Sequence, residues 1–126
     1  MFHLRLMLFS LTLCMAAMSE LQAQQLASPR DFKVWPSWST GWAWSAYANA
    51  SWSGVRGAAS YEIEFTPYAG NQTGRPFVKT TRNTSYSLLA GSPPFISSSG
   101  YRIRVRAVSP TGAKGAYTAY QTCNIN

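Results

Sequence analysis

The sequence predicts an all-β domain, an antiparallel sandwich of about seven short strands. Residues 101–107 read YRIRVRA, in which apolar side chains alternate with three arginines. Residues 61–65 read YEIEF and alternate in the same way with two glutamates. A period of two places apolar side chains on one face of a strand and charged ones on the other. No segment shows the 3.6-residue apolar repeat of an amphipathic helix, so we expect only sheet.

The N-terminus has the features of a signal peptide, which we expect to span residues 1–23. Arg5 supplies a positive charge, and residues 6–18 form an apolar run that is too short to cross a bilayer. Leu-Gln-Ala at positions 21–23 provides a cleavage site. The mature protein is therefore expected to be secreted, either extracellular or periplasmic, without a membrane span.

Cleavage leaves about 100 residues, the size of one small domain. We expect residues 24–28 to be a flexible tail and residues 29–126 to fold. Cys14 leaves with the signal peptide, and the bulky Leu13 before it argues against a lipid-attachment site. Cys123 then remains alone, which excludes an internal disulfide and leaves a dimer through this thiol as an alternative.

The first part of the domain is rich in tryptophan. We expect a short strand at residues 29–34, entered through a proline. Residues 35–47 hold four tryptophans and two breakers of regular structure, Pro36 and Gly41. We interpret this segment as a loop followed by an extended piece at residues 42–44.

The middle of the chain alternates strands with turns. Residues 48–52 alternate small apolar and polar side chains and predict a strand that ends on a buried Trp52. Residues 53–60 contain two glycines and predict a turn before the strand at residues 61–65. Residues 67–76 are rich in Gly, Asn and Pro and predict a loop.

Four further segments complete the predicted sheets. Residues 77–81 predict a short edge strand and residues 86–89 another strand, followed by a long Ser/Pro loop at residues 91–100. The arginine-bearing strand ends in a Ser-Pro-Thr-Gly turn. An aromatic-rich strand at residues 117–122 then closes a hairpin.

The formal net charge is +7, which favours encounters with anionic partners. The basic residues are spread along the chain, without the Lys/Arg run of a nucleic-acid arm. We therefore interpret the charge mainly as a source of solubility, and nucleic acid is disfavoured as a partner.

A set of residues resembles, in order and spacing, the pattern of a fibronectin type III domain. In that family a tryptophan ends the second strand, an aromatic residue opens the third, a leucine lies on the fifth and a tyrosine opens the sixth. The resemblance covers about residues 29–122 and implies an immunoglobulin-like sandwich with the third strand beside the sixth. The matching residues are Trp52, Tyr61-x-Ile63-x-Phe65, Leu88 or Leu89, Tyr101-x-Ile103-x-Val105-x-Ala107 and Thr111-Gly112.

The resemblance places Glu62 and Glu64 opposite the arginines at positions 102, 104 and 106 on the outward face. Opposed charges of this kind contribute roughly 0.2–1 kcal/mol per pair. The arginine row is then either a structural ladder or a solvated surface, and the sequence leaves both open.

Two segments depart from the family pattern. The link at residues 90–100 is longer than usual, and residues 35–47 are longer and more aromatic than the first connection of the family. Residues 35–39, WPSWS, look like the WSxWS box of cytokine receptors, in which tryptophans stack between arginines. Stacking of these tryptophans on the arginine row is an alternative that the sequence raises.

Aromatic and basic side chains supply the candidate binding surface, because Trp and Arg are enriched where binding energy concentrates. We expect one or two of the tryptophans other than Trp52 to be buried and the rest to be partly exposed. The candidate residues are Trp35, Trp38, Trp42, Trp44, Arg102, Arg104 and Arg106.

Catalytic chemistry is poorly represented. His3 is the only histidine and leaves with the signal peptide. Glu62 and Glu64 lie beside arginines, which lowers carboxyl pKa values instead of making a general acid. We therefore expect no enzyme, no cofactor and no metal site. Asn71 and Asn83 match the N-glycosylation pattern in predicted loops, which matters only in a eukaryotic source.

These observations favour a secreted, non-catalytic interaction or adhesion module that binds a protein partner through an aromatic and basic surface. One alternative is a carbohydrate-binding module, in which exposed indoles stack on sugar rings beside the amides of Asn49, Asn71 and Gln72. Another is a structural subunit of an extracellular assembly.

Overall fold

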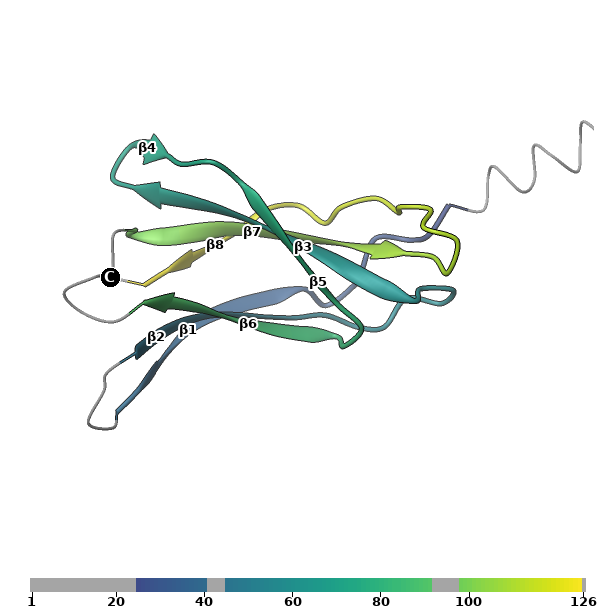
Figure 1. The fold of residues 1–126 in the computed structure, drawn as a ribbon, viewed down its shortest axis with the longest axis horizontal. Coiled ribbons are helices and arrows are strands. Elements are labelled where there is room, and N and C mark those ends of the chain that lie inside the picture. Colours follow the sequence, from purple (N-terminus) through teal and green to yellow (C-terminus); the bar gives the residue numbers. More distant parts are fainter. Residues whose placement is uncertain (1–24, 41–44, 92–97, 126) are drawn as a thin grey trace, which may run out of the picture.

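The structure is a computed structural model that describes residues 25–40, 45–91 and 98–125. Within these ranges, eight strands form two antiparallel sheets that lie one over the other (Figure 1). The predicted all-β architecture is confirmed. Within the same ranges, no helix is long and apolar enough to cross a membrane.

The smaller sheet has three strands in the order β1-β2-β6. They are β1 (Lys33–Ser39), β2 (Ser45–Ser51) and β6 (Ser85–Gly91). β2 is the central strand, and its alanines at positions 46, 48 and 50 face the other sheet fully buried. Small side chains on the central strand leave room for the larger ones that project from the opposite sheet.

The larger sheet has the order β4-β3-β7-β8, with β5 also paired to β3. Its long central strands are β3 (Ser60–Ala69) and β7 (Gly100–Val108), and β8 (Gln121–Asn124) flanks β7. β4 (Gln72–Thr73) and β5 (Phe77–Thr81) pair with the edge of β3 that is opposite to β7. The prediction that residues 77–81 form an edge strand is confirmed.

The core lies between the sheets and follows the predicted alternation. Ile63 and Phe65 on β3 and Ile103 and Val105 on β7 are completely buried. Trp52, directly after β2, is 5% exposed, and its ring centroid lies 5.4 Å from that of Tyr61. Burial of these apolar side chains supplies the main stabilisation of a domain without a disulfide.

Proline tolerance explains one error of the sequence analysis. The breakers Pro36 and Gly41 predict a loop at about residues 36–41, yet residues 36–39 belong to β1, where Pro36 lies opposite Ala48. β1 is an edge strand that is hydrogen-bonded only to β2, so it can accommodate a proline, which lacks an amide donor. β3 likewise continues through Pro67 to Ala69 and turns into β4, where a loop was expected.

The end of the chain also differs from the prediction. The strand expected at residues 117–122 begins only at Gln121. Before it, Thr118 follows β7 through two bonds: its amide donates to the Val105 carbonyl (2.9 Å), and its hydroxyl accepts from the Val105 amide (3.1 Å). A side-chain oxygen thus replaces one ladder acceptor, which keeps this segment beside β7 without regular pairing.

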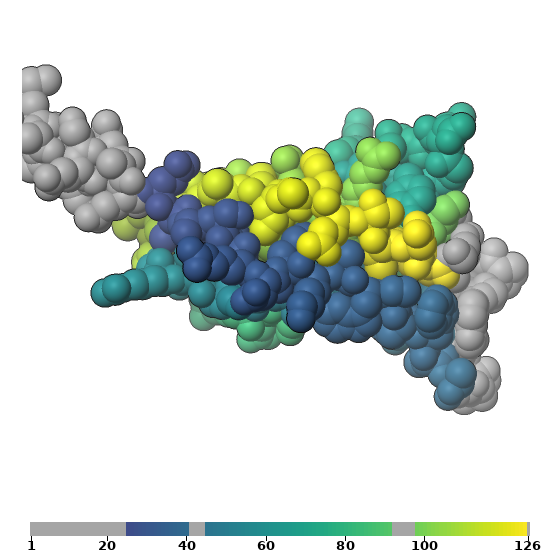
Figure 2. Space-filling model, turned by 180° about the vertical axis from the view of Figure 1, so that it is seen from behind, coloured from purple at the N-terminus to yellow at the C-terminus, as the bar shows by residue number. Residues whose placement is uncertain are grey.

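The two sheets meet along the side of the molecule seen in Figure 2, where β1 (blue) lies next to the C-terminal segment (yellow). The Gln121 side chain donates a hydrogen bond to the Phe32 carbonyl there (2.6 Å). Leu26, in the segment expected to be a flexible tail, packs against the core and approaches Gly115 closely. The expected signal peptide and residues 42–44 lie outside the described residues, as does most of the loop at residues 91–100.

Candidate functional site

The outward face of the larger sheet carries the charged residues that the sequence singled out. Glu62 lies opposite Arg106 and Glu64 opposite Arg104 in the β3–β7 register, as expected. Arg102 lies instead opposite Thr66, which cannot pair with its charge.

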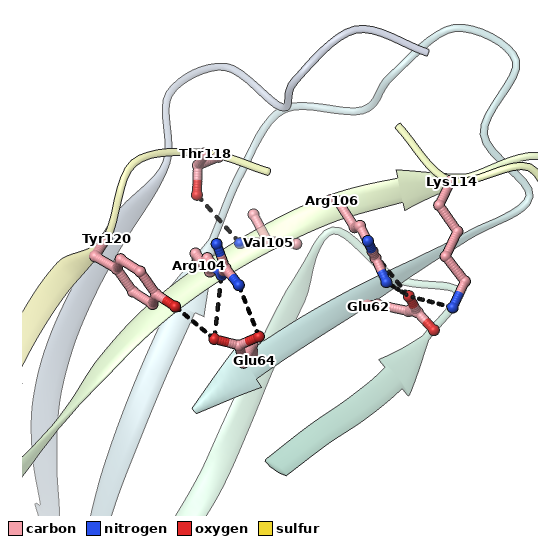
Figure 3. Close-up of polar contacts among 8 residues, drawn as sticks. All are labelled: Glu62, Glu64, Arg104, Val105, Arg106, Lys114, Thr118 and Tyr120. Carbon is pink, nitrogen blue, oxygen red and sulfur yellow. Dashed lines mark hydrogen bonds and ion pairs between the residues drawn. The ribbon is translucent and has the colours of Figure 1, made fainter. Parts of the chain in front are cut away.

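Both glutamates are engaged by guanidinium groups (Figure 3). Arg104 holds Glu64 in a two-point pair, with Nε–Oε1 and Nη2–Oε2 distances of 3.1 and 2.9 Å. Arg106 contacts Oε1 of Glu62 through Nε at 2.9 Å and Nη2 at 2.8 Å, and Lys114 lies 3.5 Å from the same oxygen. Two-point pairs of this type fix the geometry of both side chains.

Two tyrosines from the segment before β8 complete this network. The Arg104 guanidinium lies 4.0 Å from the ring centroid of Tyr117 and 4.6 Å from that of Tyr120, and Arg106 lies 4.3 Å from the Tyr117 centroid. The Tyr120 hydroxyl donates a hydrogen bond to Oε1 of Glu64 (2.6 Å). Arginine over an aromatic ring is a favourable arrangement.

We call this network the arginine–tyrosine ladder. Its members join β3, β7 and the segment that follows β7, so it fixes the last part of the chain against the sheet. The ladder consists of Glu62, Glu64, Arg104, Arg106, Tyr117 and Tyr120.

The alternative in which Trp35 and Trp38 stack on the arginine row is contradicted by their position. Trp35 and Trp38 lie on β1, in the other sheet, and the rings over Arg104 and Arg106 belong to tyrosines. The roles of Tyr117 and Tyr120 were missed by the sequence analysis, which treated them only as strand residues. The available signal was an aromatic pair directly after a row of arginines.

The electrostatics of the ladder favour the ionised form of Glu64. The hydrogen bonds from Arg104 lower the pKa of Glu64, against an opposing effect of burial. The pKa of Tyr120 is raised chiefly by its bond to the Glu64 carboxylate, and that of Tyr117 chiefly by burial. Arg104 and Tyr120 therefore hold the charged carboxylate of Glu64 in a fixed position. The lowered pKa of Glu64 is the opposite of what a general acid requires.

Of the three candidate arginines, only Arg102 is exposed. The side chains of Arg104 and Arg106 are 29% and 23% exposed and already bonded within the domain. The predicted aromatic and basic surface is therefore divided. Two of its arginines belong to the ladder, and its described tryptophans lie on the opposite sheet.

The outward face of the smaller sheet has a different chemistry. In register across the strands, Trp35 aligns with Asn49 and Ser87, and Ser37 aligns with Tyr47 and Leu89. Trp35 is 45% exposed and Leu89 is 59% exposed. Lys33 lies on this face at the start of β1, and the part beyond it is uncharged. We call this uncharged part the tryptophan face; it comprises Trp35, Ser37, Tyr47, Asn49, Ser87 and Leu89.

Asn49 lies at the centre of the tryptophan face but is only 7% exposed. Its amide nitrogen donates to the Trp35 carbonyl (3.1 Å) and the Ser37 hydroxyl (2.9 Å), and its oxygen accepts from the Ser87 hydroxyl (2.7 Å). Both amide hydrogens are therefore used, so Asn49 cannot donate to a sugar as the carbohydrate alternative required. Its role is to join three strands.

The remaining predicted residues fall into two groups. Trp38, at the far end of β1, is 47% exposed, whereas Trp42 and Trp44 lie outside the described residues. The two described candidate tryptophans are thus both partly exposed. Asn71 and Asn83 are exposed between strands, as expected for loops, and Gln72 is exposed on β4.

Cys123 is 1% exposed, and burial raises the pKa of its thiol. A buried, protonated thiol is a poor nucleophile. A disulfide with a second chain would require β8 to leave the sheet, so the native fold weighs against the dimer considered above. In residues 25–40, 45–91 and 98–125, no cluster of His, Cys, Asp and Glu could hold a metal ion.

Comparison with known proteins returns no match: no protein-family model, no curated protein and no solved structure is significantly similar to this chain.

Proposed function

We propose that this chain is an exported, non-catalytic binding module of the fibronectin type III kind, which contacts a protein partner through the tryptophan face. The observation that carries the proposal is the exposure of Trp35 and Leu89 on a sheet face without a charged side chain at its centre.

The strand arrangement supports the family assignment. If the two-residue β4 is set aside, Leu88 lies on the fifth strand and Tyr101 at the start of the sixth, which pairs with the third. Trp52 follows the second strand and Tyr61 lies at the start of the third. These positions match the pattern that the resemblance implies.

The contrast between the sheets supports the choice of surface. Large exposed apolar side chains on one face mark interaction sites more often than isolated ones do. Tryptophan is also among the residues that contribute most to protein–protein affinity. The ladder face offers less, because its guanidinium groups are already paired within the domain.

A site-specific crosslinking experiment tests the proposal. A photoreactive amino acid at position 89 is used to capture neighbours of the exported protein in its native extracellular or periplasmic fraction. We expect one protein product, which Trp35→Ala reduces strongly. Arg102→Ala is the control, because it removes a large exposed side chain from the outward face of the other sheet. Capture that does not depend on Trp35 would refute the tryptophan face as the binding surface.

The uncharged face, with an indole beside serine hydroxyls, also favours the carbohydrate alternative. Retention of the mature protein on immobilised neutral polysaccharides, abolished by Trp35→Ala and Trp38→Ala, would replace the protein partner with a glycan. Light scattering of the purified protein separates both ideas from self-assembly, which requires a particle larger than the monomer.

A further inference from the structure

The domain uses its acidic side chains internally. The side-chain carboxylates of the described residues are Asp31, Glu62 and Glu64. Both glutamates are paired within the ladder and are 19% and 13% exposed, and Asp31 accepts a hydrogen bond from Ser53. With a net charge of +7, the rest of the surface carries cations that have no carboxylate to pair with.

Three of these cations lie on or beside one strand. Arg75 precedes β5, Lys79 lies within it and Arg82 follows it, and all three are exposed. The Lys79 ammonium lies 5.8 Å from the centroid of the Phe77 ring, which holds the charge near the strand. The segment from Arg75 to Arg82 is therefore a short extended line of positive charge.

The backbone edge of β5 is also open. Among the described residues, β5 pairs only with β3, through Phe77–Phe65 at one end and Thr81–Tyr61 at the other. Alternate residues of an edge strand direct their N–H and C=O groups away from the sheet. β5 lies in front of the sheets in Figure 1, on the side of the sandwich opposite to the β1–β8 junction of Figure 2.

We propose that β5 is a second interaction surface, which binds an extended acidic peptide by adding it as a further strand beside residues 77–81. Peptides bind exposed sheet edges in this way, with main-chain hydrogen bonds supplying affinity and side chains supplying selectivity. Here Arg75, Lys79 and Arg82 select for carboxylates along the added strand. This surface lies on the larger sheet and does not depend on the tryptophan face.

Charge identifies the occupant. A second copy of this chain would meet β5 with unpaired cations of its own, because its described glutamates are held in the ladder. Cations on an edge strand repel like copies and protect against aggregation. The same charges attract an acidic strand, so the edge discriminates by sign.

Binding to a defined probe tests this proposal. The probe is a fluorescent peptide that alternates glutamate with valine, and fluorescence anisotropy measures its dissociation constant for the mature protein. The peptide is expected to bind and to slow hydrogen exchange of the β5 amides. A peptide of equal charge with a central proline should bind about tenfold more weakly, because proline removes a donor and prevents pairing.

Charge variants locate the site. Lys79→Glu combined with Arg82→Glu should weaken peptide binding by about tenfold or more. Arg30→Glu combined with Lys33→Glu changes the net charge by the same amount at the start of β1, an edge strand of the other sheet, and should leave the affinity within about twofold. Trp35→Ala should also leave it unchanged, which separates this surface from the tryptophan face.

Three results would overturn the proposal. Equal affinity for the proline peptide or for a sulfated polysaccharide would show that β5 attracts polyanions in general and does not add a strand. Equal losses in the β5 double variant and the Arg30/Lys33 double variant would show that only net charge matters. Absence of peptide binding by a correctly folded protein would leave β5 with a purely repulsive role.

Discussion

The two outward faces of this sandwich differ in whether their side chains are engaged by other residues of the domain. On the larger sheet, Glu64, Arg104 and Tyr120 contact one another, so the polar groups of that face serve the domain itself. On the smaller sheet, Trp35 and Leu89 remain exposed without a covering segment among the described residues. The same alternation of side chains therefore gives one sheet face whose charged groups, apart from Arg102, are paired within the domain, and another whose large apolar side chains are exposed.

This difference shows that a charged residue on the outward face of a strand is not necessarily available to a binding partner. The arginines are the more conspicuous feature of the sequence, yet two of them are engaged in fixing the end of the chain. Whether a charged strand face is free depends on what crosses it, and here the segment before β8 crosses it.

The largest effect is expected from Arg104→Ala, the central member of the ladder. The change removes a two-point pair with Glu64 and the contacts with two tyrosine rings. It also leaves a largely buried carboxylate without its guanidinium partner, with only the Tyr120 hydroxyl still bonded to it, so we expect a loss of about 2 kcal/mol in the free energy of unfolding. Urea denaturation measures this loss. A loss below about 0.5 kcal/mol, the usual value for a free surface residue, would contradict the ladder.

Lowering the pH tests how much the ionised form of Glu64 contributes to stability. Its pKa is lowered in the folded state from the ordinary value of 4.5, chiefly by Arg104. The stabilisation is therefore complete above the unfolded pKa and is lost as the pH falls through the lower folded value. Denaturation from pH 6 to pH 3 should show a steeper loss of stability in the wild type than in Glu64→Gln. Equal slopes would show that Glu64 is not stabilised as an ion.

Tyr120→Phe is expected to have a smaller effect, because only the hydroxyl bond to Glu64 is lost while the ring remains over Arg104. We expect a loss of about 0.5–1 kcal/mol. The pKa of Tyr120 is raised, so its stabilisation is present below the unfolded pKa and disappears as the pH rises through the folded value. The variant should lose less stability than the wild type on alkaline titration, and an identical profile would exclude the hydroxyl bond.

The smallest effect on stability is expected on the tryptophan face. Trp35 is about half exposed, so Trp35→Ala should change the free energy of unfolding by roughly 0.5 kcal/mol or less. Urea denaturation of this variant beside Arg104→Ala compares the two faces directly. A loss as large as that of Arg104→Ala would mean that Trp35 is a structural residue and would remove the basis for the proposed binding surface.

The sequence was sufficient to predict features that depend on local alternation. The burial of Ile63 and Val105 follows from a period of two. That Glu62 and Glu64 face the arginine row required, in addition, the strand order that the family resemblance implies, and the register itself was not predicted. Pro36 was misjudged because its tolerance depends on β1 lying at a sheet edge, which no local pattern reveals.

The composition of the site could be predicted only in part. Tyr117 and Tyr120 reach the arginines because Thr118 substitutes for a ladder acceptor and keeps the segment beside β7. Asn49 was read as a possible ligand group, whereas its bonds to both neighbouring strands bury it. Both outcomes depend on contacts between segments far apart in the sequence, which composition and periodicity do not encode.

Solvent exchange of the arginine Nε–H protons, measured by NMR, shows whether Arg104 and Arg106 are paired within the domain. We expect slow exchange for Arg104 and Arg106, because their Nε–H groups donate to Glu64 and Glu62, and fast exchange for the exposed Arg102. Equally fast exchange at all three positions would show that these guanidinium groups are not held by the glutamates. The two sheet faces would then not differ in whether their side chains are engaged within the domain.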